Sequence, residues 1–152
     1  MGRIRLCLLT MCSVLGAQSL AMAQDFAAEP QDPSGKFLTA TEIKQILPHT
    51  KNSWIAVRPY DGQDLLYFTN LLAWRCGLHQ ISFAINGGAL QPLITEPCYA
   101  DEAAPNALKI DNGVLPYVAF GPDTIKTIQL HLLYDDMSEE TARFDRQSVQ
   151  IN

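Results

Sequence analysis

Cys76 and Cys98, the two cysteines in the body of the chain, have the chemistry most restricted by spacing. Redox-active pairs usually show close C-x-x-C spacing in an electropositive setting, and neither feature surrounds these residues. Free or metal-bound thiols are the remaining alternative. An even number of cysteines in an exported chain favours a structural disulfide, which here closes a loop of about 23 residues and contributes roughly 3 kcal/mol.

Three histidines, His49, His79 and His131, are candidate metal ligands or general bases. None of them shows the His-x-His or i, i+4 spacing of a zinc site. The acidic turn over residues 135–140 offers oxygen ligands but lacks the glycine that bends a calcium loop. We therefore predict no metal and no cofactor. A small periplasmic hydrolase or metal-dependent enzyme, using His79 or His131 with nearby carboxylates, is the rival interpretation.

Motifs for nucleophilic catalysis and phosphate binding are absent from the sequence. There is no G-x-S-x-G nucleophile elbow. Asn86-Gly87-Gly88 lies between two expected strands, so no helix N-terminus follows it to receive a phosphate. The sequence therefore favours a non-enzymatic function over an enzymatic one.

Tryptophan and tyrosine side chains are the remaining chemical lead, because amphipathic aromatics are enriched at interfaces. A sandwich of this size also needs large core residues, so we expect about two of six aromatic residues to be exposed enough to bind a ligand: Trp54, Tyr60, Tyr67, Trp74, Tyr99 and Tyr117. Arg58 and Arg75 would hold an acidic group of a ligand, or pair with Asp61 and Asp64. The candidate binding residues are Trp54, Arg58, Tyr60, Trp74, Arg75 and Tyr99.

The N-terminus has the pattern of a Sec-type signal peptide. Arg3 and Arg5 precede an apolar run, and Ala21-Met22-Ala23 is a small-x-small cleavage site. The run of about 12 apolar residues is shorter than the roughly 20 needed to span a bilayer. We predict a cleaved signal over residues 1–23, a flexible leader over 24–36 and one disulfide-stapled domain over 37–152, in the periplasm or secreted.

The charge balance limits the partners. All 16 Asp and Glu follow residue 23, whereas two of the 11 Lys and Arg leave with the signal, so nine positive charges face 16 negative ones and the net charge becomes −7. Such a domain repels phosphate backbones and anionic lipid, which disfavours nucleic-acid and membrane-surface partners. No later stretch is long and apolar enough to span a membrane.

Short elements must position these residues. Thr39-Ala-Thr-Glu42 fits a helix capping box, and Pro48 is expected to end that helix. Asn86-Gly87-Gly88 predicts a hairpin turn after a strand over 81–85, with a return strand over 90–94 in which Pro92 implies an edge. The segment from Leu65 to Cys76 is ambiguous: we favour one or two strands, with helix as the alternative.

Further strands are expected over 53–60, 107–110, 114–120, 125–134 and 141–151, with Ile128, Leu130, Leu132 and Tyr134 on one face. About eight short strands with regular turns predict a small antiparallel β-sandwich, Ig-like in architecture, with one short N-terminal helix.

From this architecture we expect an exported non-enzymatic binding module that presents a sheet edge or an aromatic patch to a protein or glycan partner. An inhibitor or immunity-type protein is a further alternative, because it would use the same surface features.

Overall fold

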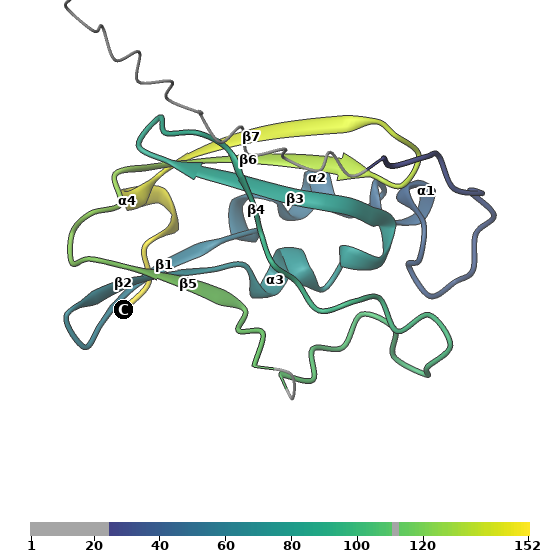
Figure 1. The fold of residues 1–152 in the computed structure, drawn as a ribbon, viewed down its shortest axis with the longest axis horizontal. Helices are drawn as coiled ribbons and strands as arrows, with labels where there is room; N and C mark the ends of the chain where they lie inside the picture. The colour runs from purple at the N-terminus through teal and green to yellow at the C-terminus, as the bar shows by residue number, and fades with distance from the viewer. Residues whose placement is uncertain (1–24, 111–112) are drawn as a thin grey trace, which may run out of the picture.

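The chain folds into two antiparallel sheets with a few short helices (Figure 1). The computed structural model describes residues 25–110 and 113–152. The three-stranded sheet has the order β1-β2-β5 and the four-stranded sheet the order β4-β3-β6-β7, the small β-sandwich that the strand pattern predicts. The strands are β1 (Ala56–Tyr60), β2 (Gln63–Tyr67), β3 (Leu78–Ile85), β4 (Gln91–Pro92), β5 (Tyr117–Phe120), β6 (Thr127–Tyr134) and β7 (Glu139–Asp145).

The predicted signal segment, residues 1–23, lies outside the described residues, as do residues 111 and 112 of the turn expected at Asp111-Asn112-Gly113. Within the described part of the chain, no helix is long and apolar enough to cross a membrane.

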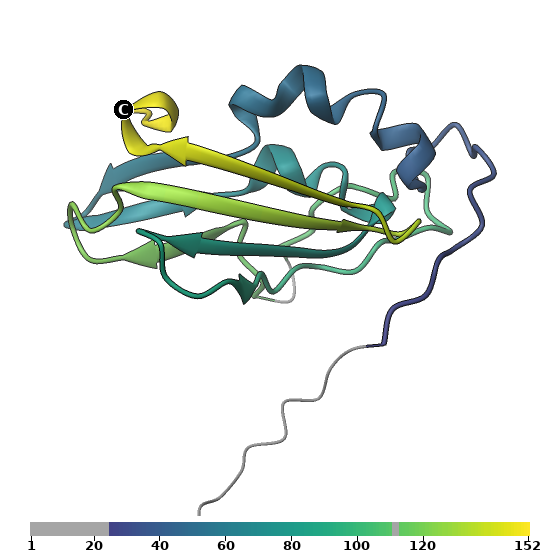
Figure 2. The ribbon, with the colours of Figure 1, turned by 90° about the horizontal axis from the view of Figure 1, so that it is seen from above.

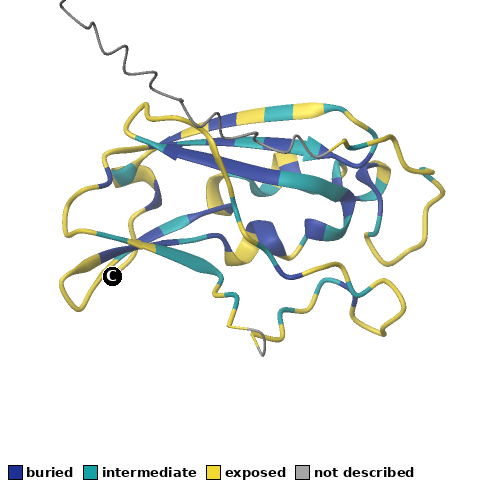
Figure 3. Ribbon diagram, in the orientation of Figure 1, coloured by how far each residue is buried: buried dark blue, intermediate teal, exposed yellow. Residues whose placement is uncertain are grey.

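Buried and more exposed residues alternate along the strands, and the buried ones form the core between the two sheets (Figure 3). On the three-stranded sheet Val57 and Leu66 face inward in one cross-strand row. Phe68 and Phe83 meet between the sheets with ring centroids 5.2 Å apart. Figure 2 shows β3, β6 and β7 side by side, and four alternate residues of β6 are buried as their spacing predicts: Ile128, Leu130, Leu132 and Tyr134.

Short helices connect the strands. The predicted capping box is present, with the Glu42 carboxylate accepting the Thr39 N–H at 3.3 Å. The prediction that Pro48 ends this helix is wrong: Pro48 lies in the first turn of a second helix, where a missing N–H removes no intrahelical bond. The helices are α1 (Ala40–Ile43), α2 (Leu47–Thr50), α3 (Thr69–Leu72) and α4 (Arg146–Val149), with 3-10 turns η1 (Lys51–Ser53) and η2 (Arg75–Gly77).

The segment from Leu65 to Cys76 is a strand only as far as Tyr67 and then turns into α3 and η2. Leu71 and Leu72 are both buried. Consecutive residues of a strand point to opposite faces, whereas one helical turn can direct both into the same core. The favoured interpretation of this segment as strand is therefore wrong beyond Tyr67.

Three other expected strands differ from the prediction. Residues 107–110 form no strand, because the N–H groups of Lys109 and Ile110 donate to the Glu96 carboxylate instead of to a ladder. The final strand ends at Asp145, and α4 follows it. The return strand of the hairpin shortens to β4, which lies at a sheet edge as Pro92 implies.

The two sheets are joined on one side only. Gln150 forms a parallel bridge with Val57, and the Ile151 N–H donates to the Val57 carbonyl at 2.9 Å, so the segment after β7 continues onto β1. On the other side, β4 and β5 are the edge strands, and within the described residues no ladder joins them. We call this gap between β4 and β5 the open seam.

A buried ion pair fixes α4 to the three-stranded sheet. Asp64 of β2 is 1% exposed and faces inward, where Arg146 donates to both of its carboxylate oxygens, one at 2.7 Å. The Ile125 N–H adds a bond of 3.3 Å. Hydrogen bonding from Arg146 is the main cause that lowers the pKa of Asp64 in the folded state.

Asp64→Asn is expected to destabilise the domain by about 3 kcal/mol at pH 7, because it leaves the Arg146 guanidinium without its buried partner. A lowered folded-state pKa stabilises the fold above the unfolded pKa, near 4, and this stabilisation is lost as pH falls. The difference between wild type and variant in urea unfolding should therefore shrink from pH 7 to pH 3. Asp123→Asn is the control, since exposed Asp123 lies 3.6 Å from the same guanidinium; equal effects of the two substitutions at pH 7 would contradict the assignment.

Candidate binding site

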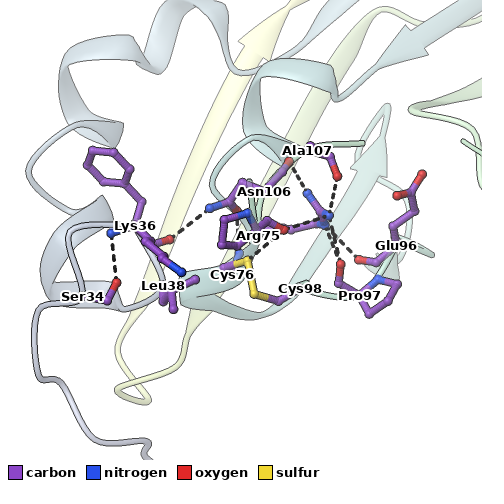
Figure 4. The surroundings of a disulfide bond; sticks show 12 residues. Ser34, Lys36, Leu38, Arg75, Cys76, Glu96, Pro97, Cys98, Asn106 and Ala107 are labelled. Carbon is purple, nitrogen blue, oxygen red and sulfur yellow. Dashed lines mark hydrogen bonds between the residues drawn. A yellow bond between two sulfur atoms is a disulfide. The ribbon is translucent and has the colours of Figure 1, made fainter. Parts of the chain in front are cut away.

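Arg75 is buried, and its side chain bonds to the protein's own backbone instead of lying on a binding surface. Its side chain, 5% exposed, donates to backbone carbonyls of the segment that follows β4 (Figure 4). Nη1 lies 2.6 Å from the Asn106 oxygen and Nη2 lies 2.9 Å from the Pro97 oxygen. Further acceptors are the carbonyls of Leu72, Glu96, Pro105 and Ala107.

Glu96 complements Arg75 from the same segment. It is 3% exposed and accepts the N–H groups of Lys109 at 2.9 Å and Ile110 at 2.6 Å, and the Tyr99 hydroxyl at 3.0 Å. These bonds, first that from Lys109, lower the pKa of Glu96 against the opposing effect of burial. Two buried charges thus bond to five backbone carbonyls and two N–H groups of residues 96–110, in place of a strand ladder.

The predicted disulfide lies beside this cluster. The Cys76 and Cys98 sulfurs are at bonding distance, 2.12 Å, and the Cys76 N–H donates to the Asn106 side chain at 3.1 Å. The disulfide and the Arg75 contacts together fix residues 96–98 and 105–107 to η2.

The six candidate binding residues separate into three places. Trp54 is 1% exposed in the core, and its indole N–H donates to the Leu47 carbonyl at 3.0 Å. Tyr99 is half-buried between Arg75 and Lys109, and Trp74 is half-buried with its ring edge-on to Phe37. Only Arg58 and Tyr60 lie together on an open face, so we do not retain the other four in the candidate surface.

That open face is the outer side of the three-stranded sheet. The register places Ala56 beside Tyr67, and Tyr67 beside Tyr117, with the Tyr67 and Tyr117 rings 5.0 Å apart. Arg58 lies over the ring of Tyr60, which is 57% exposed, at 5.0 Å. Arg58 pairs with neither Asp61 nor Asp64, the partners considered from sequence. Tyr67 and Tyr117 belong to the aromatic residues considered from sequence but not to the six candidate binding residues, and only the pairing of β2 with β5 brings them together.

The β5 edge at the open seam carries unused backbone groups. The Phe68 N–H donates to the Pro116 carbonyl at 2.8 Å, which makes this a hydrogen-bonded pair of the antiparallel ladder. Hydrogen-bonded and non-hydrogen-bonded pairs alternate along an antiparallel ladder, so the backbone N–H and C=O groups of Val118 and Phe120 also point to β2. The backbone groups of Tyr117 and Ala119 point to the open side instead. Within the described residues, no backbone bond from another segment reaches Tyr117 or Ala119.

An apolar groove of about 410 Å³ runs along the open seam. Ile94 is 78% exposed and Leu115 is 45% exposed at its rim. The walls come from β4 and the residue after it, from the buried Phe83, and from the stretch that leads into β5: Gln91, Pro92, Leu93, Val114, Tyr117 and Val118.

No protein-family model, curated protein or solved structure matches this chain.

The two histidines of the rival hypothesis are already engaged. His79 Nε2 lies 2.8 Å from the Ala27 carbonyl, its ring stacks on Phe26 at 4.9 Å, and its Nδ1 lies 3.7 Å from Glu29. His131 Nε2 lies 3.0 Å from the Glu139 carboxylate on the surface. Across the described ranges, no group of three or more His, Cys, Asp or Glu is arranged to hold a metal ion.

A larger cavity, about 670 Å³, lies beside His79 and contains the carboxylates of Glu29, Glu96 and Asp135. Glu96 belongs to the Arg75 cluster, and Asp135 accepts the Ala40 N–H and the Gln31 amide, each at 2.8 Å. Phe26, Ala27 and Glu29 therefore contact the histidine that a hydrolase would need free.

We expect the chain over residues 24–152 to contain no free thiol when denatured without reductant, because Cys76 and Cys98 are joined. Maleimide labelling followed by mass spectrometry checks this. The variant Cys76→Ser should label once per molecule and serves as the positive control. Double labelling of the wild type under the same conditions would contradict the bridge.

Arg75→Lys should lower the free energy of unfolding by roughly 2–4 kcal/mol, because an ammonium cannot reach the set of buried carbonyls that the planar guanidinium satisfies. Limited proteolysis should then cut within residues 96–110, where the wild type resists. Arg58→Lys, on the outer face of the sheet, is the matched control and should change neither property. A proteolysis pattern identical to the wild type would show that Arg75 does not hold this segment.

Proposed function

We propose that this protein is an exported, non-enzymatic binding module that holds an extended, uncharged segment of a protein partner against the β5 edge. The observation that carries the proposal is the open seam, where unused backbone groups of β5 lie beside an apolar groove. Addition of a strand to such an edge gives affinity through backbone bonds and specificity through side-chain pockets.

Export is supported by the N-terminal signal pattern and by the cysteine pair at disulfide distance. The structural disulfide fits an oxidising compartment, in the periplasm or outside the cell.

The chemistry of the partner segment follows from the charges around the seam. Residues 87–95 and 113–122 contain no Asp, Glu, Lys or Arg, although the chain as a whole has 16 acidic and 11 basic side chains. Natural sheet edges are commonly protected by charged residues, above all lysine. An unprotected, neutral, apolar edge favours a neutral strand with apolar side chains on one face.

Proline residues limit which strand edge can pair with a partner strand, and over how many residues. Pro116 and Pro122 bracket β5, so the edge offers Tyr117 and Ala119 and little more. On the opposite side, Leu93 N–H and Ile81 C=O form a ladder bond, so Pro92 directs outward only a carbonyl. A partner strand would therefore pair with β5 and place its apolar side chains toward β4.

Ala119→Pro tests the backbone pairing, because it deletes the outward N–H of β5 while the bonds to β2 from Val118 and Phe120 remain. Short random peptides are selected by display on the wild type, and the best is labelled and titrated by fluorescence anisotropy. We expect neutral, β-forming peptides, at least about tenfold weaker binding to Ala119→Pro, and slowed hydrogen exchange at the Tyr117 and Ala119 amides on binding.

Thr141→Pro is the matched control. Tyr134 N–H donates to the Ser138 carbonyl, so alternation along β7 directs the Thr141 N–H away from β6 on an edge remote from the seam. This variant should bind the peptide like the wild type. Selection of charged peptides, equal binding by Ala119→Pro, or occupation of the edge by a second copy in a concentration-dependent dimer would each overturn the proposal.

A further inference from the structure

A third cavity, of about 380 Å³, lies at the end of the outer face of the three-stranded sheet, where β1 begins and β2 ends. Arg58 and Tyr67 contribute to it from the sheet, Ser53 from η1, and Thr69 and Asn70 from α3. Ile151 and Asn152, which follow α4, also line it. Its volume falls within the range of about 300–1,000 Å³ that is usual for small-molecule sites. It is separate from the open seam.

The charge of this cavity differs from that of the chain. No Asp or Glu lines it, so Arg58 supplies its one charged side chain in a protein with a net charge of −5. Elsewhere in the described chain, four Lys and Arg side chains form ion pairs with carboxylates: Lys44, Lys51, Lys109 and Arg146. Within the described residues no carboxylate lies at ion-pair distance from Arg58, whose partner is the ring of Tyr60.

The polar groups around Arg58 suit a ligand that carries hydroxyl groups. The Asn70 side-chain NH₂ donates to the Ser53 carbonyl at 2.8 Å, which directs its Oδ1 to the other side as an acceptor. The Thr69 hydroxyl can donate and accept, and Tyr67 presents an amphipathic ring. Arg58 adds a planar fork of donors that matches a carboxylate.

We propose that this cavity binds a carboxylate-bearing saccharide, a uronic acid unit of an acidic glycan. The carboxylate pairs with the Arg58 guanidinium, the ring lies against Tyr67, and the sugar hydroxyls bond to Asn70 and Thr69. This inference does not rest on the peptide site, because neither Ala119 nor the groove of the open seam contributes to the cavity.

Calorimetric titration with a linear tri-uronate, and with the neutral trisaccharide of the same linkage, tests the proposal. We expect binding of the tri-uronate only, weakened at least about tenfold by Arg58→Gln, which removes the charged hydrogen bonds. Arg58→Lys should restore part of the affinity, since it keeps the charge but not the fork. Asn70→Ala should weaken binding without changing its dependence on salt.

Arg143→Gln is the matched control. Arg143 of β7 also lines a cavity, about 250 Å³, but Asp145 lines it too and no tyrosine does. Its substitution should leave the affinity unchanged. Equal binding of the neutral trisaccharide, an unaltered affinity of a folded Arg58→Gln variant, or tighter binding of a glutamate-rich peptide than of the tri-uronate would each overturn the proposal.

Discussion

The buried guanidinium of Arg75 is the interaction on which the remainder of the structure depends. In the described residues between β4 and β5, 93–110 and 113–116, no strand forms, so their carbonyls and N–H groups have no ladder to bond to. A buried backbone group without a partner is costly. Arg75 provides donors for this segment and Glu96 provides acceptors, and the Cys76–Cys98 bridge fixes one end to the same 3-10 turn.

This arrangement also explains why the sandwich stays open on one side. A segment bonded to Arg75 and Glu96 through its own backbone cannot extend β5 or lengthen β4 into a matching strand. The two edges therefore remain short, and the side chains between them, such as Ile94 and Leu115, remain exposed. The seam is a consequence of how the irregular segment is satisfied, and its neutral composition decides what can pair with it.

Local sequence patterns were sufficient to predict those parts of the fold in which the environment of a residue is decided by its neighbours in the sequence. The alternation of β6, the capping box at Thr39, the edge position implied by Pro92 and the cysteine pair are all of this kind. The structure of the segment from Leu65 to Cys76 was harder to predict, because apolar residues such as Leu71 and Leu72 fit either a helix or a strand. Only the core that receives both side chains decides between the two.

The candidate site was less accessible from sequence, because it depends on contacts between distant residues. Nothing near Arg75 indicates that its partners are carbonyls more than twenty positions away, and an arginine beside aromatics was therefore interpreted as a surface group. Arg58 and Tyr60 were chosen by the same reasoning and do lie on an open face. The strand register, which brings Tyr67 and Tyr117 to that face, could not be deduced before the pairing of β2 with β5 was known.

The edge and the outer face of the three-stranded sheet present different chemistry, which keeps the two proposed sites distinct. At Tyr117 the backbone groups point to the seam within the plane of the sheet, while the ring stands on the outer face against Tyr67. Arg58 lies on β1, with β2 between it and β5. A strand added at β5 therefore uses backbone donors and apolar side chains, whereas a ligand at Arg58 uses charge and hydroxyl bonding.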